Sequence, residues 1–261
     1  MRQANWFGLA LATILLLPNL LTQLAKWLHL LRLAEQKTPL KSAWRSLIIG
    51  YPLGFVTPGR LGEISRAFFI KEVPTKNAVS LFIIDKVATS CMTIGFGCCA
   101  LLLMPKLHFP TWISAALIIT PTSIALLIAT STLWPNFYAR LTPLAAGSFL
   151  RRTQIGLIWL WSLAFYATFT LQLILLVATF SGRLTSAFLL AAPATFFIKT
   201  VLPIAFGDLG IRESAAVFFF GQIEIPEAVA FNASLTLYLI NVVIPTLAGL
   251  PTLLKTRKIL R

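Results

Sequence analysis

Long apolar stretches separated by short polar connections dominate the pattern of the chain. Five of them reach the length of about 20 residues that crosses a bilayer as a helix. We predict spans at residues 6–27, 78–104, 112–134, 155–180 and 228–254. Tryptophans about 31 Å of helix apart bracket the first span (Trp6 and Trp27) and the third (Trp112 and Trp134), as interfacial anchors do. Pro18 predicts a kink in the first span.

Two further apolar stretches are interrupted by polar residues. The first has an arm over residues 46–56, a polar sequence from Thr57 to Arg66 and a short arm that ends near Lys71. The second has an arm over residues 187–206, a polar stretch and a short arm that ends at Phe220. Because an arm of about 11 residues is too short to cross, we predict two re-entrant helical hairpins. Their tips contain Thr57, Pro58, Gly59 and Gly62 in the first hairpin, and Pro203, Gly207 and Gly210 in the second.

The first tip has the residues that begin a helix. Thr57 suits an N-cap, Pro58 suits the first helical position, and Gly59 allows a backbone or a ligand to come close. We therefore expect a helix that begins inside the membrane, with its positive dipole end beside Arg60.

Charge is scarce but strongly basic. The 261 residues include 22 Lys and Arg against 8 Asp and Glu, a formal net charge of +14, and charged residues make up 11% of the chain. A soluble domain carries about 25%, so we predict an integral membrane protein. The basic residues gather in the connections between spans, which argues against nucleic-acid binding.

The positive-inside rule gives an orientation. With the N-terminus outside and the C-terminus in the cytoplasm, the basic connections all fall inside, at residues 26–45, 71–76, 140–152 and 255–261. The acidic loop with Glu224 and Glu227 then falls outside. We expect the basic face to contact anionic lipids of a bacterial or archaeal cytoplasmic membrane. A homo-oligomer is compatible with this arrangement.

The order of spans and hairpins predicts an all-α membrane protein with an inverted-topology repeat. Each half contains a span, a hairpin and another span, at about residues 5–104 and 153–255, and the span at 112–134 links the halves. Residues 1–261 then form a single transmembrane domain.

Ionisable side chains within the membrane need a partner or a water-filled cavity. The candidate substrate-binding residues are therefore Arg60, Glu63, Arg66, Asp85, Lys86, Lys199, Asp208, Arg212 and Glu213. We expect a polar cavity between the two tips, in which arginine forks hold a phosphate group. The carboxylates would orient the arginines, meet a cationic headgroup or take up a proton. The alternative is a set of buried salt bridges that only fixes the hairpins.

Other chemistry has weak support in the sequence. The three cysteines fit neither a disulfide framework nor a zinc spacing, and both histidines are isolated. We expect no catalytic residue, metal or cofactor. Gln172, Asn232 and Asn241 lie within spans, where interhelical hydrogen bonds are the usual role of such residues.

Three motifs resemble a known family, the lysylphosphatidylglycerol synthase transmembrane region, also called the flippase-like family. They are Thr57-Pro58-Gly59-Arg60-Leu61-Gly62-Glu63 with Arg66, then Ile84-Asp85-Lys86, and then residues 202–213 with Gly207-Asp208-Leu209-Gly210-Ile211-Arg212-Glu213. The resemblance implies a domain that moves a lipid between leaflets. Two features are expected to depart from the family pattern: the spans predicted in this sequence include no counterpart of the family's additional N-terminal span, and Asp208 stands where glycine is expected.

The resemblance and the charges together favour a translocase for an anionic or zwitterionic phospholipid or a polyprenyl-phosphate-linked lipid. The sequence contains no Walker-type nucleotide motif and no soluble transferase domain, so we expect neither ATP-driven transport nor lipid aminoacylation. Two alternatives stay open. One is a membrane-embedded enzyme or accessory subunit acting on a lipid-phosphate carrier, with Asp85, Glu63 or Glu213 as base. The other is a transporter of a small solute or ion.

Overall fold

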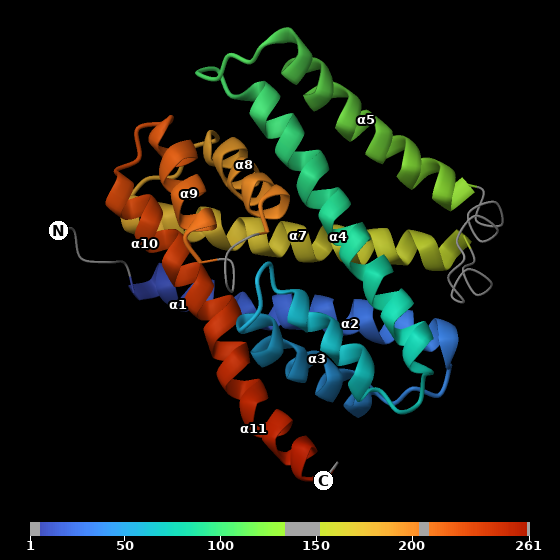
Figure 1. The fold of residues 1–261 in the computed structure, drawn as a ribbon. Helices are drawn as coiled ribbons and strands as arrows, with labels where there is room; N and C mark the ends of the chain where they lie inside the picture. Colours follow the sequence, from blue (N-terminus) through green and yellow to red (C-terminus); the bar gives the residue numbers. More distant parts are fainter. Residues whose placement is uncertain (1–5, 134–151, 204–208, 260–261) are drawn as a thin grey trace.

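The computed structural model describes residues 6–133, 152–203 and 209–259, and it builds them from helices joined by turns (Figure 1). Five helices are long and apolar enough to cross a membrane: Trp6–Ala34, Thr75–Leu103, Thr111–Leu133, Thr153–Ser181 and Glu227–Lys255. They coincide with the five predicted spans. The largest difference is in the first, which continues past Trp27 to Ala34. Trp134, the predicted second anchor of the third span, lies outside the described residues.

Prolines interrupt the first and last of these spans. The first consists of α1 (Trp6–Ile14) and α2 (Leu16–Ala34). Pro18 has no N–H for the Ile14 carbonyl four residues earlier and its ring clashes with it, so the helix breaks there. The last consists of α10 (Glu227–Tyr238), a π-helical turn η3 (Leu239–Val243) and α11 (Ile244–Ile259). Pro245 likewise cannot donate to the Asn241 carbonyl, and the π turn widens the helix at Asn241.

The first broken segment forms a helix pair, α3 (Leu40–Phe55) and the 3₁₀ helix η1 (Leu61–Phe69). The prediction that this second helix begins at Thr57 and Pro58 is wrong. It begins after Arg60, which has a left-handed backbone with φ 58° and ψ 28°. Thr57 still caps the helix from a distance, because its Oγ1 accepts a hydrogen bond of 2.7 Å from the amide of Gly62.

The second broken segment forms the helix pair α8 (Phe188–Val201) and α9 (Ile211–Gly221). Gly210, with φ 89°, precedes α9, and its amide donates a 2.7 Å hydrogen bond to Glu213 Oε2. Gly207 and Asp208 lie outside the described residues. The two helix pairs meet at Gly59, where an added Cβ would lie only 2.6 Å from the carbonyl oxygen of Pro203. This close approach, together with a φ of 57°, explains the glycine.

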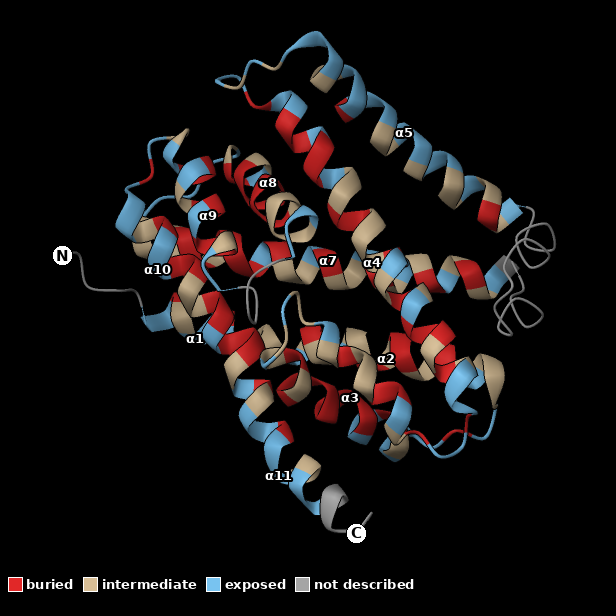
Figure 2. Cartoon of the chain, in the orientation of Figure 1, coloured by how far each residue is buried: buried red, intermediate tan, exposed pale blue. Residues whose placement is uncertain are grey.

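The spans pack reciprocally against the two helix pairs (Figure 1). The helix α4 (Thr75–Leu103), which follows the first pair, packs on α8, and α11, which follows the second pair, packs on α3. The helix α7 (Arg152–Ser181) packs on α2, α4 and α10. By contrast, α5 (Thr111–Leu133) lies at the edge of the molecule and is largely exposed (Figure 2). The helix pairs, α2, α4 and α7 therefore surround the interior, where the charged residues gather.

Candidate functional site

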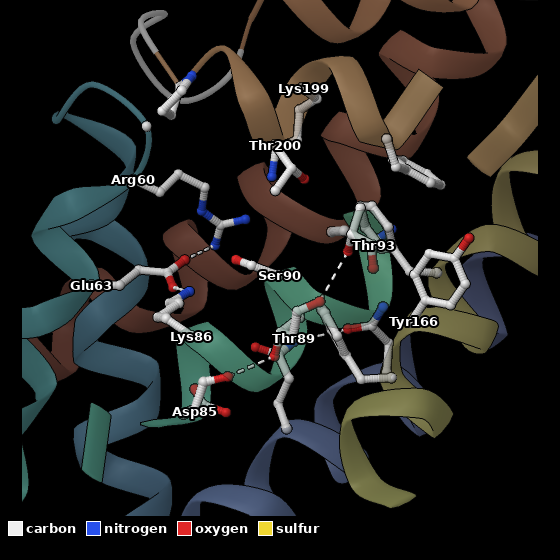
Figure 3. A pocket seen from close by; sticks show the side chains of 18 of the residues that line it. Arg60, Glu63, Asp85, Lys86, Thr89, Ser90, Thr93, Tyr166, Lys199 and Thr200 are labelled. Atoms are coloured by element: carbon white, nitrogen blue, oxygen red, sulfur yellow. Dashed lines mark hydrogen bonds and ion pairs between the residues drawn. The ribbon is translucent and has the colours of Figure 1, made fainter. Parts of the chain in front are cut away.

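A cavity of about 310 Å³ lies between the two helix pairs, with α2, α4 and α7 completing its walls (Figure 3). Its charged lining residues are Lys26, Arg60, Glu63, Asp85, Lys86 and Lys199. Its neutral polar lining includes the side chains of Asn19, Gln23, Tyr51, Thr89, Ser90, Thr93, Thr200 and Asn241. An aromatic wall comes mainly from α7, with Phe165, Tyr166 and Phe169.

One ion-pair group, which we call the outer cluster, consists of Arg60, Glu63 and Lys86. Glu63 Oε1 pairs with Arg60, and Glu63 Oε2 pairs with Lys86. The left-handed turn at Arg60 and the first turn of η1 bring Arg60 and Glu63 together at an i,i+3 spacing. The side chain of Lys86 is 44% exposed, whereas those of Arg60 and Glu63 are 17% and 11% exposed. The outer cluster therefore lies at the mouth of the cavity.

A second group, the inner cluster, consists of Lys26, Arg66 and Asp85, whose side chains are all less than a tenth exposed. Lys26 Nζ lies 2.6 Å from Asp85 Oδ1, and Arg66 pairs with Asp85 Oδ2. The guanidinium of Arg66 also lies over two aromatic rings, 4.2 Å from the centroid of Trp27 and 4.8 Å from that of Phe82. Such a position fixes the planar group by stacking as well as by charge.

The two clusters share one arrangement of charge. Each of the four carboxylate oxygens of Glu63 and Asp85 carries a different cation. Each cluster therefore has one positive charge in excess. Lys199 adds a further basic side chain from α8, on the far side of the cavity from Glu63 (Figure 3). Among the described lining residues, positive charge exceeds negative, and such a cavity attracts an anion.

Three of the predicted site residues do not line this cavity. Arg66 lies behind Asp85 in the inner cluster. Arg212 and Glu213 are each only 2% exposed and pair with each other at 2.6 Å. Arg212 Nε also donates a 3.0 Å hydrogen bond to Ser234 on α10. The start of α9 therefore directs this pair toward α10. Asp208, the remaining predicted residue, lies outside the described part of the chain.

Two predictions about the end of the first span are wrong. Lys26 looks like part of a basic loop in the sequence, but the helix continues to Ala34 and buries it in the inner cluster. Trp27 looks like an interfacial anchor, but it is fully buried, and its indole donates a 2.9 Å hydrogen bond to Ser46.

Sequence reasoning also missed the neutral polar lining on α2. The signal for it was present, because Asn19, Gln23 and Lys26 are spaced i, i+4 and i+7, which places them on one helix face within an apolar span. The predicted interhelical role of Asn241 is confirmed, since its Nδ2 donates a 2.8 Å hydrogen bond to Gln172. It lines the cavity as well.

The fold and this cavity define a class: a multi-pass helical membrane protein with an ion-paired, positively charged interior site. The family model described as the lysylphosphatidylglycerol synthase TM region matches residues 1–249, and the chain belongs to this family. The family that the three sequence motifs resemble is thereby confirmed. A search of curated proteins finds no match to the chain. Within the described residues, no group of three or more His, Cys, Asp and Glu side chains is arranged to hold a metal ion.

Proposed function

We propose that this protein translocates a lipid with a phosphate-containing headgroup between the leaflets of a membrane. The substrate would be a phospholipid or a polyprenyl-phosphate-linked lipid. The observation that carries the proposal is the pairing of both carboxylates in the cavity with two cations each. The acidic groups thus hold basic groups in place, and the excess positive charge is left to a ligand. The family name, which ties the matched region to a lipid-modifying synthase, supports a lipid over a soluble anion.

The headgroup would enter at the outer cluster while the lipid tails stay in the bilayer. Lys86 is the most exposed charge of the outer and inner clusters and would meet the phosphate first. Arg60, deeper in the cavity and stacked 5.3 Å from the ring centroid of Tyr51, would take it next. The contact between Gly59 and Pro203 would then mark the narrow point between the helix pairs.

An inverted repeat with two re-entrant helix pairs is part of the proposal. Its support is the reciprocal packing of each helix pair on the span that follows the other. A Cβ on Gly97 of α4 would clash with the side chain of Phe197 of α8, and one on Gly249 of α11 would clash with a backbone oxygen of α3. The two glycines occupy the same position in their 29-residue spans.

The proposed orientation follows the positive-inside rule, with the N-terminus outside a bacterial or archaeal cytoplasmic membrane and the C-terminus inside. The basic cytoplasmic connections would contact anionic lipids. Movement would be downhill or coupled to an ion, because the chain has no Walker-type nucleotide motif.

The geometry favours this function over membrane-embedded catalysis. A general base needs a carboxylate that is free to accept a proton. Glu63 and Asp85 each hold two cations, and Glu213 is engaged by Arg212, Ser234 and the amide of Gly210. These groups are suited to positioning their partners.

Reconstitution tests the proposal. Purified protein is placed in liposomes with a fluorescent phosphatidylglycerol, and dithionite bleaches the copies in the outer leaflet. We expect the wild type to expose the inner-leaflet copies, and Arg60→Ala and Glu63→Ala to abolish this exchange. Lys106→Ala is the matched control, because it removes an exposed ion pair of 3.6 Å with Glu224, away from the cavity. Wild-type rates in both cavity variants would overturn the proposal.

A further inference from the structure

The inner cluster contains a buried lysine to which the proposed path of the headgroup gives no role. Lys26 is 2% exposed and belongs to α2, in the wall of the cavity. It shares the carboxylate of Asp85 with Arg66, so two buried cations have one anion between them. One positive charge of this cluster is therefore uncompensated, and a buried charge without a counter-ion is costly.

Of the three charges in this cluster, that of Lys26 is the one that can be given up. An arginine stays protonated in proteins. Asp85 has a cation at each of its oxygens, and protonation of the carboxylate would weaken both contacts. A lysine, by contrast, can release its proton in a protein interior. With Lys26 neutral, Arg66 and Asp85 form a balanced pair, and the cluster has no net charge.

The neighbours of the Lys26 amine suit both of its protonation states. Nζ lies 2.6 Å from Asp85 Oδ1, 2.6 Å from Thr89 Oγ1 and 3.4 Å from Ser162 Oγ. Thr89 accepts from the lysine, because its own hydroxyl donates to the backbone oxygen of Asp85. An ammonium group has an N–H for each of the three neighbours. A neutral amine has N–H groups for Asp85 and Thr89 and a lone pair, to which the Ser162 hydroxyl can donate by turning from the carbonyl of Ile158.

An anion in the cavity changes the charge balance around Lys26. Asp85 and Lys86 are consecutive on α4, so the inner and outer clusters are neighbours in one wall of the cavity (Figure 3). A phosphate held by Arg60 and Lys86 brings negative charge near Lys26, in an interior where salt screens charge weakly. A nearby negative charge favours the protonated form of a lysine. Anion binding and protonation therefore strengthen each other, because such coupling is reciprocal.

Other titratable groups around the cavity are less suited to exchange a proton. Glu63 has a cation at each carboxylate oxygen, as Asp85 does. Lys86 is 44% exposed and paired with Glu63, so water and a carboxylate both stabilise its charge. His29, one turn further along α2, contacts the backbone oxygen of Gln154 at 3.3 Å and is not a lining residue. The charged and titratable groups that face Lys26 are Asp85 and Lys86 of α4, Glu63 and Arg66 of η1, Tyr51 of α3, Tyr166 of α7 and Lys199 of α8.

We propose that Lys26 is the coupling-proton site of the cavity. Its amine takes up one proton from the solvent when an anionic headgroup binds, and the ammonium returns this proton when the headgroup leaves. Only an N–H bond forms and breaks in this exchange. The inference rests on the proposed function and names the ion to which binding of the headgroup is coupled.

Binding of dihexanoyl phosphatidylglycerol to the purified full chain in uncharged detergent tests the inference. Calorimetry is carried out from about pH 6 to about pH 9, a range in which no unperturbed carboxylate or tyrosine titrates. Buffers of different ionisation enthalpy give the number of protons taken up. We expect up to about one proton per bound lipid in the wild type, and an affinity that falls by up to about tenfold per pH unit as Lys26 loses its proton. Constant affinity without proton uptake would overturn the inference.

Variants identify the group that takes up the proton. Lys26→Arg has a permanent charge and should bind the lipid at constant affinity without proton uptake. Lys26→Met has no charge, and its affinity should equal, at every pH, that of the wild type at the alkaline end of the range; it decides the question if the larger arginine does not fold. Lys86→Arg is the matched control, because it fixes the charge of the outer cluster in the same way and should keep the proton uptake. Uptake that persists in the Lys26 variants would place the proton elsewhere and overturn the inference.

The outcomes separate this inference from the proposed function. If the lipid binds without proton uptake, only the inference falls. If the wild type binds inorganic phosphate with proton uptake but binds no lipid, the coupling stands and lipid translocation falls. If it binds neither at any pH, both fall.

Discussion

The inner cluster allows a quantitative test of how buried charge is held in this protein. Asp85→Asn keeps the shape of the side chain and removes its charge. Lys26 and Arg66, 2% and 3% exposed, then remain as two buried cations that share no anion. Breaking a buried ion pair from one side costs about 3–5 kcal/mol, because the remaining charge is left uncompensated. We expect the free energy of unfolding to fall by that amount.

The second step of this test is a double-mutant cycle. Lys26→Met alone leaves Asp85 paired with Arg66, so it removes charge-assisted hydrogen bonds to Asp85 and Thr89 at a cost of about 1.5–3 kcal/mol. In the double variant only one cation is left without an anion. The combined loss should therefore be smaller than the sum of the two single losses.

The assay is reversible unfolding in mixed micelles titrated with sodium dodecyl sulfate, followed by circular dichroism. Glu72→Gln is the matched control, because Glu72 is exposed and bonded to Ser42 outside the cavity, and it should change stability by less than about 0.5 kcal/mol. Two results would contradict this description of Asp85 as the counter-ion of both cations. One is a free energy of unfolding for Asp85→Asn within about 1 kcal/mol of wild type. The other is a loss in the double variant equal to the sum of the two single losses.

Three further changes have expected outcomes. Lys86→Gln should slow lipid exchange in the liposome assay yet change the free energy of unfolding by less than about 1 kcal/mol, because its ion pair is partly exposed. Unaltered exchange would remove Lys86 from the entry path. Gly59→Ala should lower the free energy of unfolding in the detergent titration by about 1–2 kcal/mol, because the added Cβ would clash with Pro203 and the φ of this residue is positive. Wild-type stability of this variant would contradict the contact. Gly249→Ala should lower the free energy of unfolding by about 1–3 kcal/mol, because the added Cβ would push α11 away from α3. Gly156→Ala is the control: open space surrounds the added Cβ, so the free energy of unfolding should not fall. Equal losses of stability in the two variants would refute the close packing of α11 on α3.

The carboxylates of the two helix pairs differ in their surroundings, although the sequence motifs are alike. Glu63 lines the cavity and pairs with Arg60 and Lys86. Glu213, by contrast, is buried, pairs with Arg212 and accepts a hydrogen bond from Ser234. The first pair thus supplies the ion-paired Arg60 and Glu63 to the site, and the second supplies Lys199 and Thr200 from the end of α8 and Pro203 just after it.

The sequence by itself determines the spans, because about 20 consecutive apolar residues have few other stable environments. It also indicates the interruption near Pro18, since a proline removes a helical hydrogen bond, although α3, α5 and α8 continue through Pro52, Pro121 and Pro193. The sequence also predicts that Arg60, Glu63, Asp85, Lys86 and Lys199 gather at a cavity, because an ionisable group in an apolar segment requires a partner or a cavity.

Only the tertiary structure decides which of these groups meet. Sequence spacing fixes the face of a single helix, but Lys26 and Asp85 come from different spans, and their contact depends on how α2 and α4 pack. The same holds for Arg66: its position in the sequence is compatible with facing the cavity, but the structure buries its guanidinium against the rings of Trp27 and Phe82. Periodicity is local, whereas ion pairing and cavity shape follow from the relative placement of helices far apart in the chain.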